Sequence, residues 1–190
     1  PGTYAVSLAS CIDGKISELA PPVKFEVKAL AAVSLPAKDR AELAAFQKKV
    51  RRLYSSVTAA SSALRELGTR TRHYRASLKS VTAPHGDILD SIKALEAKLD
   101  ALQLKMFGDR VLSRLDKDTF PGIANRIGTV AGDTASSTSA PTRMQRDGYA
   151  IAEEEFRPVY EELKKILAED IAAIEKRLDA VGAPYTPGRL

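Results

Sequence analysis

Two kinds of side chain in this chain could take part in catalysis: paired carboxylates and histidines. Asp87 and Asp90, and the acids at 153–155, could act as general acid and base. Acids toward the start of a helix are already favoured by the helix dipole, which accounts for them without catalysis. His73 and His85 lie twelve positions apart with no third ligand at metal spacing, so we expect no zinc site. We therefore assign no catalytic residue, no metal ligand and no cofactor site.

Serine and cysteine nucleophiles are also not expected. Serines cluster at 55–62 and 136–139, but no Gly-x-Ser-x-Gly turn accompanies them. Cys11 is the only cysteine, which excludes an internal disulfide and a cysteine-rich zinc site. We interpret it as a small apolar filler in or beside a strand. The residues thus predict that this piece of chain is not an enzyme.

The charges are distributed unevenly along the chain, whose net charge is +5. Segment 38–80 carries eleven Lys and Arg against three acids, whereas 141–181 carries seven bases and ten acids. One interpretation is a basic rod that binds a polyanion, with contacts at Arg70, Arg72 and Arg75. The other is that complementary charges on the first and last helices set their pairing, which is the interpretation we favour.

The N-terminal residues 1–33 have the alternation of strands. Apolar residues alternate with polar or small ones in 3–8 and again in 23–28, and Asp13-Gly14 between them favours a tight turn. Two strands alone cannot bury enough surface to be stable. Either they pack on the rest of the chain, or they are the last strands of a β-sandwich, and we favour the second.

From residue 36 to 190 the pattern becomes helical, with helices predicted over about 37–81, 85–107, 121–131 and 141–181. The first helix carries a continuous apolar seam at steps of four and three, which is typical of coiled-coil-like packing. The last helix should have a kink before Pro158. Its apolar face should be widened by Val159 and Ile166 and should follow Phe156, Tyr160, Leu163, Leu167, Ile171, Ile174, Leu178 and Val181. Residues 109–121 should be mostly loop, Gly132 should end the third helix, and an N-cap should precede Pro141.

Short connections between amphipathic helices make neighbours antiparallel. The fold class predicted is therefore mainly α: a long antiparallel bundle of three to four helices with an N-terminal β-hairpin that is the remnant of a β-sandwich. At 44% apolar and 28% charged residues the composition is that of a globular protein. No stretch reaches the roughly 20 apolar residues of a membrane span, so we expect no transmembrane segment.

Three stretches of the second half resemble a known group of proteins: FPGIANRIGTVAG (120–132), SAPTRMQRDGYAIAEEEFRPVYEEL (139–163) and LDAVGAPYTPGRL (178–190). They are similar to the C-terminal region of secreted bacterial sortilin-like proteins, whose β-propellers are built from neuraminidase-type repeats and which are commonly labelled glycosyl hydrolases. The opening PGTYAVSL resembles the end of the immunoglobulin-like domain that precedes that region. The resemblance implies a secreted or periplasmic location and an upstream propeller, and it transfers no catalytic residue to this chain.

We therefore expect a non-catalytic structural or interaction module of a larger extracytoplasmic protein or complex, which supports or docks a β-propeller or a partner subunit. The opening Pro-Gly-Thr-Tyr, without an initiator Met, also favours a piece of a longer precursor or a processed product. One alternative is an accessory C-terminal part of a glycoside hydrolase. A second is binding of a polyanion or nucleic acid through the basic first helix, where nucleic acid is the less favoured partner.

Overall fold

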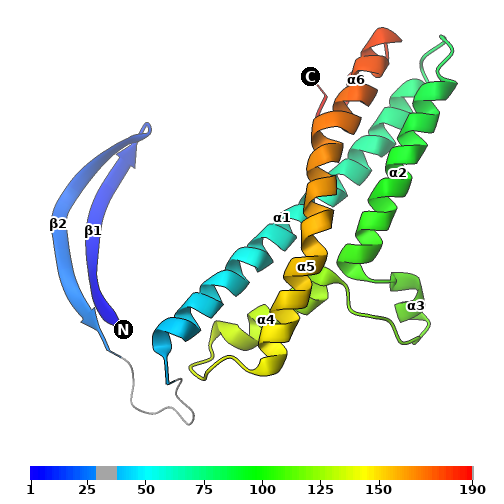
Figure 1. Ribbon diagram of the computed structural model, residues 1–190. Coiled ribbons are helices and arrows are strands. Elements are labelled where there is room, and N and C mark those ends of the chain that lie inside the picture. The colour runs from blue at the N-terminus through cyan, green and yellow to red at the C-terminus, as the bar shows by residue number, and fades with distance from the viewer. Residues whose placement is uncertain (29–37, 190) are drawn as a thin grey trace. The chain divides into compact units, whose positions relative to one another are not determined.

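Figure 1 shows the computed structural model of the chain, which describes residues 1–28 and 38–189. They belong to two compact units, Pro1–Pro36 and Ala37–Leu190. The boundary predicted near residues 33–36 lies outside the described residues. The architecture is mainly helical with an N-terminal two-stranded hairpin, which confirms the predicted fold class.

The first unit is an antiparallel hairpin of strands β1 (Gly2–Ile12) and β2 (Lys15–Val27). The turn lies at the predicted position, where Asp13 has φ 51° and Gly14 has φ 76°. Positive φ at both central residues is the requirement of a two-residue turn that matches the twist of the strands. Local turn chemistry therefore fixes where the hairpin reverses.

One face of the hairpin is apolar and exposed within this unit. The pairing shifts register between Val6 and Leu8, across from Pro21 and Pro22, which have no N–H for the ladder. Ahead of the shift, Tyr4 stacks on its cross-strand partner Phe25 with ring centroids 6.0 Å apart. The exposed apolar residues of this face are Tyr4, Val6, Val23, Phe25 and Val27.

The second unit is a bundle in which the chain runs up, down and up again (Figure 1). Its elements in chain order are α1 (Arg40–Leu78), α2 (Gly86–Phe107), α3 (Arg110–Arg114), α4 (Ile123–Ala135), α5 (Arg143–Lys165), the π-helical segment η1 (Ile166–Asp170) and α6 (Ile171–Ala180). Helix α1 begins at its N-cap Asp39, whose carboxylate accepts from the backbone N–H groups of Ala41 and Glu42 at 2.8 and 3.0 Å. None of the described helices is long and apolar enough to span a membrane.

The apolar seam of α1 is buried along the helix, as its steps of four and three predict. The buried seam residues are Phe46, Val50, Leu53, Val57, Ala60, Leu64, Leu67, Thr71, Tyr74 and Leu78. Helices α4 and α2 provide most of the cover, and α5 packs on α1 less extensively. The seam is thus covered by several helices in succession, not chiefly by the last one.

The descent of the chain is broken where α2 ends and α4 begins. Gly108, at φ 74°, caps α2, and the short helix α3 follows within the segment predicted as mostly loop. Gly122 lies against this turn so closely that a Cβ there would meet the backbone nitrogen of Gly108 at 2.5 Å. Only glycine fits at residue 122, because any side chain would separate the two backbones.

Helix α4 extends past the predicted end. Gly132 lies inside the helix, which continues to Ala135. Gln47 of α1 donates through Nε2 to the carbonyls of Thr134 and Ser137 at 2.8 and 3.0 Å. A side chain from another helix satisfies these terminal carbonyls, so a tertiary contact sets the end of α4 and the local glycine signal does not.

The last helix differs from the prediction in its start and its buried face. The N-cap is Thr142, after Pro141, and it forms a capping box with Gln145. Tyr160 and Leu167, predicted on the apolar face, are each 45% exposed. The other predicted residues of the face that are buried are Phe156, Leu163, Ile171, Ile174 and Leu178, together with Val159 and Ile166, which were expected to widen it, and Ala152.

The jump of five from Ile166 to Ile171 in this face coincides with η1. A π-helical turn contains one residue more than an α-helical turn and so realigns the face that follows. Helix α5 itself runs through Pro158, and the departure from α-helical hydrogen bonding lies at η1, eight residues later.

The buried seam predicts a large effect of truncation within it. Leu64→Ala should lower the free energy of unfolding by about 3 kcal/mol, since Leu64 is 0% exposed and its removal leaves a cavity. Leu104→Ala, at a residue that is 54% exposed, is the matched control and should cost under about 1 kcal/mol. Urea denaturation followed by circular dichroism measures both values. Equal effects would contradict the assignment of Leu64 to the core.

Candidate functional site

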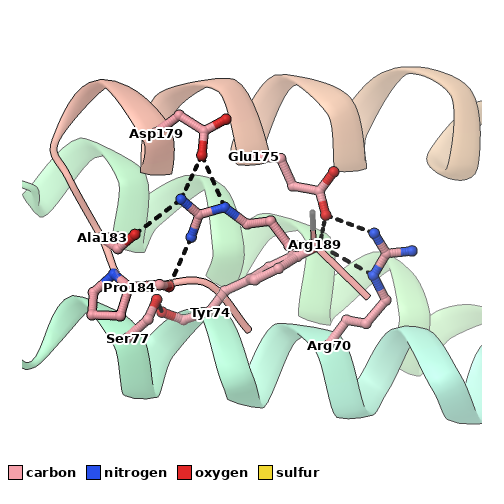
Figure 2. A network of polar contacts seen from close by, with 8 residues as sticks. All are labelled: Arg70, Tyr74, Ser77, Glu175, Asp179, Ala183, Pro184 and Arg189. Atoms are coloured by element: carbon pink, nitrogen blue, oxygen red, sulfur yellow. Dashed lines mark hydrogen bonds and ion pairs between the residues drawn. The ribbon is translucent and has the colours of Figure 1, made fainter. Parts of the chain in front are cut away.

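A network of polar side chains connects α1, α6 and the C-terminal segment (Figure 2). Arg70 and Tyr74 lie one turn apart on α1, and Glu175 and Asp179 lie one turn apart on α6. Residues four apart share one face of a helix, so each pair faces the same neighbour. Arg189 reaches the network from the segment that follows α6.

Tyr74 and Glu175 form the centre of the network. The Tyr74 hydroxyl donates to Glu175 Oε1 at 2.5 Å, and Arg70 Nη2 donates to the same oxygen at 2.6 Å. Arg70 Nε also donates to the Tyr74 hydroxyl at 3.2 Å. Tyr74 is 0% exposed, so its hydroxyl is satisfied within the protein and does not need water.

These contacts set the protonation of the two α1 side chains. Burial, together with the hydrogen bond to Glu175, raises the pKa of Tyr74 from 10.0 to about 12. Burial lowers the pKa of Arg70, but its hydrogen bonds to Glu175 and Tyr74 outweigh that effect and leave the pKa raised. At neutral pH both side chains are therefore fixed donors to one carboxylate.

The C-terminal segment is held by Arg189, which is 3% exposed. Its guanidinium donates to Asp179 Oδ1 at 2.5 and 3.1 Å and to the carbonyls of Ala183 and Pro184 at 3.0 and 3.1 Å (Figure 2). The backbone carbonyl of Gly188 accepts from Arg70 Nη2 at 3.1 Å. The segment is thus bound at both its start and its end.

The arrangement suits a structural role better than proton transfer. Each carboxylate, on Glu175 and on Asp179, already accepts from an arginine, and the buried tyrosine is held protonated. A general acid or base needs a pKa near the working pH, which a tyrosine at about 12 does not have. Within residues 1–28 and 38–189 no group of histidine, cysteine and carboxylate side chains has the geometry of a metal site.

The three arginines predicted as polyanion contacts do not share one surface. Arg70 faces α6 in the network above. Arg72 is exposed and bonds to its own helix, at the carbonyl of Gly68 (3.2 Å) and the hydroxyl of Thr69 (3.0 Å). Arg75 pairs with Glu96 of α2 at 3.1 Å. Only Arg72 and Arg75 line the same cavity, which lies between α1 and α2.

Complementary pairing between the first and last helices is also sparse. Among the described residues, Arg70 is the only α1 cation that pairs with a carboxylate of α5 or α6. In a second contact the charges are reversed, since Arg146 of α5 provides the cation and Glu42 of α1 the carboxylate, 2.8 Å apart. Other pairs between helices involve α2 or α4, as between Lys98 and Asp170 at 2.6 Å.

Three of the carboxylates considered for catalysis, Asp87, Asp90 and Glu153, have structural partners. Asp87 pairs with Arg177 of α6, whose hydrogen bond lowers the pKa of Asp87. Asp90 pairs with Lys93, and Glu153 accepts from the Tyr149 hydroxyl at 2.7 Å.

The remaining candidates for chemistry stand apart from the network. His85 Nδ1 lies 2.8 Å from the carbonyl of Ala83, and His73 is half-buried on α1. Cys11, expected as an apolar filler, is exposed on β1. None of these side chains contributes to the network of Figure 2.

The network itself was not predicted from the sequence. The available signal was the spacing of four between Glu175 and Asp179, which places both carboxylates on one face. Their partners lie on α1 and in the C-terminal segment, and no local pattern indicates that pairing.

Comparison of the chain with models of protein families, with curated proteins and with solved structures gives no match. The resemblance drawn from the sequence therefore stays a hypothesis.

The contacts of Arg189 predict its contribution to stability. Arg189→Ala should lower the free energy of unfolding by about 1–3 kcal/mol, because it leaves two carbonyls and one carboxylate without a donor. Arg143→Ala removes the same charge from an exposed ion pair and should change the value by less than about 0.5 kcal/mol. Thermal denaturation compares the two variants, and indistinguishable melting temperatures would contradict the role of Arg189.

The raised pKa of Tyr74 predicts a loss of stability at high pH. The unfolded chain releases the proton of Tyr74 near pH 10 and the folded chain near pH 12. The contribution of Tyr74 to the free energy of unfolding is therefore fully present below pH 10 and is lost as the pH rises through 12. In Tyr74→Phe the free energy of unfolding should decrease by about 2 kcal/mol less over this pH range than in the unsubstituted chain. Tyr185→Phe, at an exposed ring, should leave the slope unchanged. Denaturant melts between pH 9 and pH 12, roughly the range of these proton losses, measure the effect.

Proposed function

We propose that the chain is a non-catalytic structural and interaction module of a larger extracytoplasmic protein or complex. In this proposal the bundle is a rigid support for a β-propeller or a partner subunit, secreted or periplasmic as the sequence resemblance implies. The observation that carries the proposal is the polar network of Figure 2, where both carboxylates are engaged in holding the chain together.

The core of the bundle supports a mechanical role. Apolar side chains fill the space along α1, from Phe46 to Leu78, and the polar contacts connect helices at its two ends. Close-packed interiors deform little and transmit strain, as a support requires. Interior polar groups are used to fix helix pairing, as between Arg70 and Glu175.

The hairpin supports the idea of a larger assembly. Its strands are 11 and 13 residues long, and one face exposes a row of apolar side chains within its unit. Isolated two-stranded hairpins are marginal in water, and a third strand or a packed layer is needed for stability. Completion of a β-sandwich by other strands would provide that layer.

The alternative is that the chain is an accessory part of a glycoside hydrolase. Such enzymes need two carboxyl groups roughly 5–10 Å apart in a cleft, one of them free to donate a proton. Glu175 and Asp179 are both held by arginines, so they do not favour this role. The resemblance in sequence is compatible with a longer protein that is a glycoside hydrolase, but the catalytic carboxylates of such an enzyme would lie outside this chain.

A truncation experiment tests the proposal. We expect the native protein to be longer than these 190 residues, and removal of residues 37–190 to lower the melting temperature of what remains. Leu64→Ala in the longer protein should lower the melting temperature less than the truncation does. A native protein with the mass of these residues alone, or an unchanged melting temperature after truncation, would contradict the support role.

An activity assay separates the proposal from the alternative. The purified chain should not hydrolyse a panel of nitrophenyl glycosides, because neither carboxylate of the network is available to the leaving group. Turnover that Glu175→Gln or Asp179→Asn abolishes would establish a hydrolase and overturn the assignment. Turnover that both variants retain would indicate a contaminating enzyme, and the purified double variant serves as that control.

A further inference from the structure

Helices α1 and α2 enclose a groove that the polar network does not use. A cavity of about 670 Å³ lies between them, lined on the α1 side by three arginines and on the α2 side by two acids. A smaller cavity of about 280 Å³ adjoins it, since Arg65 and Gln103 line both. The two cavities therefore lie side by side in one groove and differ in their lining.

The smaller cavity has the composition of a socket for one apolar side chain. Tyr54, Val57, Leu64 and Phe107 line its wall, and the hydroxyls of Thr58 and Ser61, which also line it, donate to carbonyls of their own helix. Arg110 lies over the Phe107 ring, with the guanidinium carbon 5.0 Å from the ring centroid. An apolar socket with a charged rim is the usual anchor of a binding interface.

The larger cavity carries cations that have no carboxylate partner. Arg65 Nη2 bonds to the Ser62 hydroxyl at 3.1 Å, and Arg72 bonds to its own helix. Neither pairs with an acid among residues 1–28 and 38–189, whereas Arg75 is neutralised by Glu96. Arg65 and Arg72 lie seven positions apart on α1, which is about 10 Å along the helix axis.

The α2 side of the cavity offers acceptors beside those cations. Asp100 lines it and forms no ion pair within the described part of the chain. The amide of Gln103 can both donate and accept. A ligand that carries acidic groups and also N–H donors would satisfy both walls.

We propose that this groove binds an acidic peptide segment in polyproline II conformation, with one apolar side chain in the socket and two acidic side chains on Arg65 and Arg72. A polyproline II chain has three residues per turn and advances about 3.1 Å per residue, so acidic side chains three apart share one face about 9 Å apart, close to the 10 Å between the arginines. Backbone N–H groups of the peptide donate to Asp100. The site is the interaction part of the proposed function and rests on it.

The same features disfavour other polyanions. Asp100 lies in the groove without a cation partner among the described residues and would repel the closely spaced phosphates of a nucleic acid. The aromatic side chains, Tyr54 and Phe107, lie at the socket end only, so successive bases would have no stacking platform along the arginines. A peptide places its charges at intervals and leaves room for the acids between them.

A direct binding experiment uses the complete chain and the probe acetyl-Phe-Gly-Glu-Gly-Gly-Glu-amide. Titration followed by nuclear magnetic resonance should show saturable shifts in 65–75 and 99–107. The analogue with both Glu replaced by Gln should bind at least tenfold more weakly, since charged hydrogen bonds are lost. The absence of saturable shifts up to about 1 mM peptide would overturn the proposal.

Matched charge variants separate the groove from general attraction. Arg65→Ala with Arg72→Ala should weaken binding at least tenfold, whereas Arg51→Ala with Arg52→Ala removes the same charge outside the groove and should change it less than twofold. Equal weakening would overturn the proposal. Tighter binding of hexathymidylate or of a heparin tetrasaccharide than of the peptide would also overturn it. Failure here leaves the truncation test unaffected, so the two proposals fail separately.

Discussion

Burial of the α1 seam is the constraint on which the rest of the bundle depends. Helix α1 has 39 residues, whereas α2 has 22 and α4 has 13, so no single neighbour of this kind can cover its apolar face. Two helices, α2 and α4, therefore cover α1, and Gly108 and Gly122 approach each other closely where α2 ends and α4 begins. The continuous run of α5, η1 and α6 packs beside both α4 and α2, and its polar contacts with α1 therefore range from Glu42 to Tyr74.

The sequence predicted those elements whose signals are local. Steps of four and three identified the seam of α1, and Asp13-Gly14 identified the hairpin turn, because apolar period and turn chemistry act within a few residues. The predicted end of α4 was wrong because Gln47, which is distant in sequence, donates to the carbonyls at the end of that helix. The assignment of Tyr160 and Leu167 to the apolar face was wrong because the face runs through Val159 and Ile166, each one position earlier in its turn.

The candidate site was less predictable than the fold for the same reason. Arg70, Arg72 and Arg75 are equivalent in a count of charge, yet one meets α6, one remains on its own helix and one meets α2. Their faces on α1 differ, since steps of two and three residues rotate a side chain around the helix. What each guanidinium does is therefore decided by the neighbouring helix, which the sequence of α1 does not contain.

The π-helical segment connects the packing of the core to the polar network. A single extra residue within 166–170 rotates everything after it by about 100° relative to a continuous α-helix. Ile171 and Ile174 are thereby buried, and Glu175, which follows on the adjacent position, meets Tyr74. Without the extra residue the apolar face and the carboxylates of α6 would both turn away from α1. The register of one turn therefore determines whether the C-terminal segment has a network to bind.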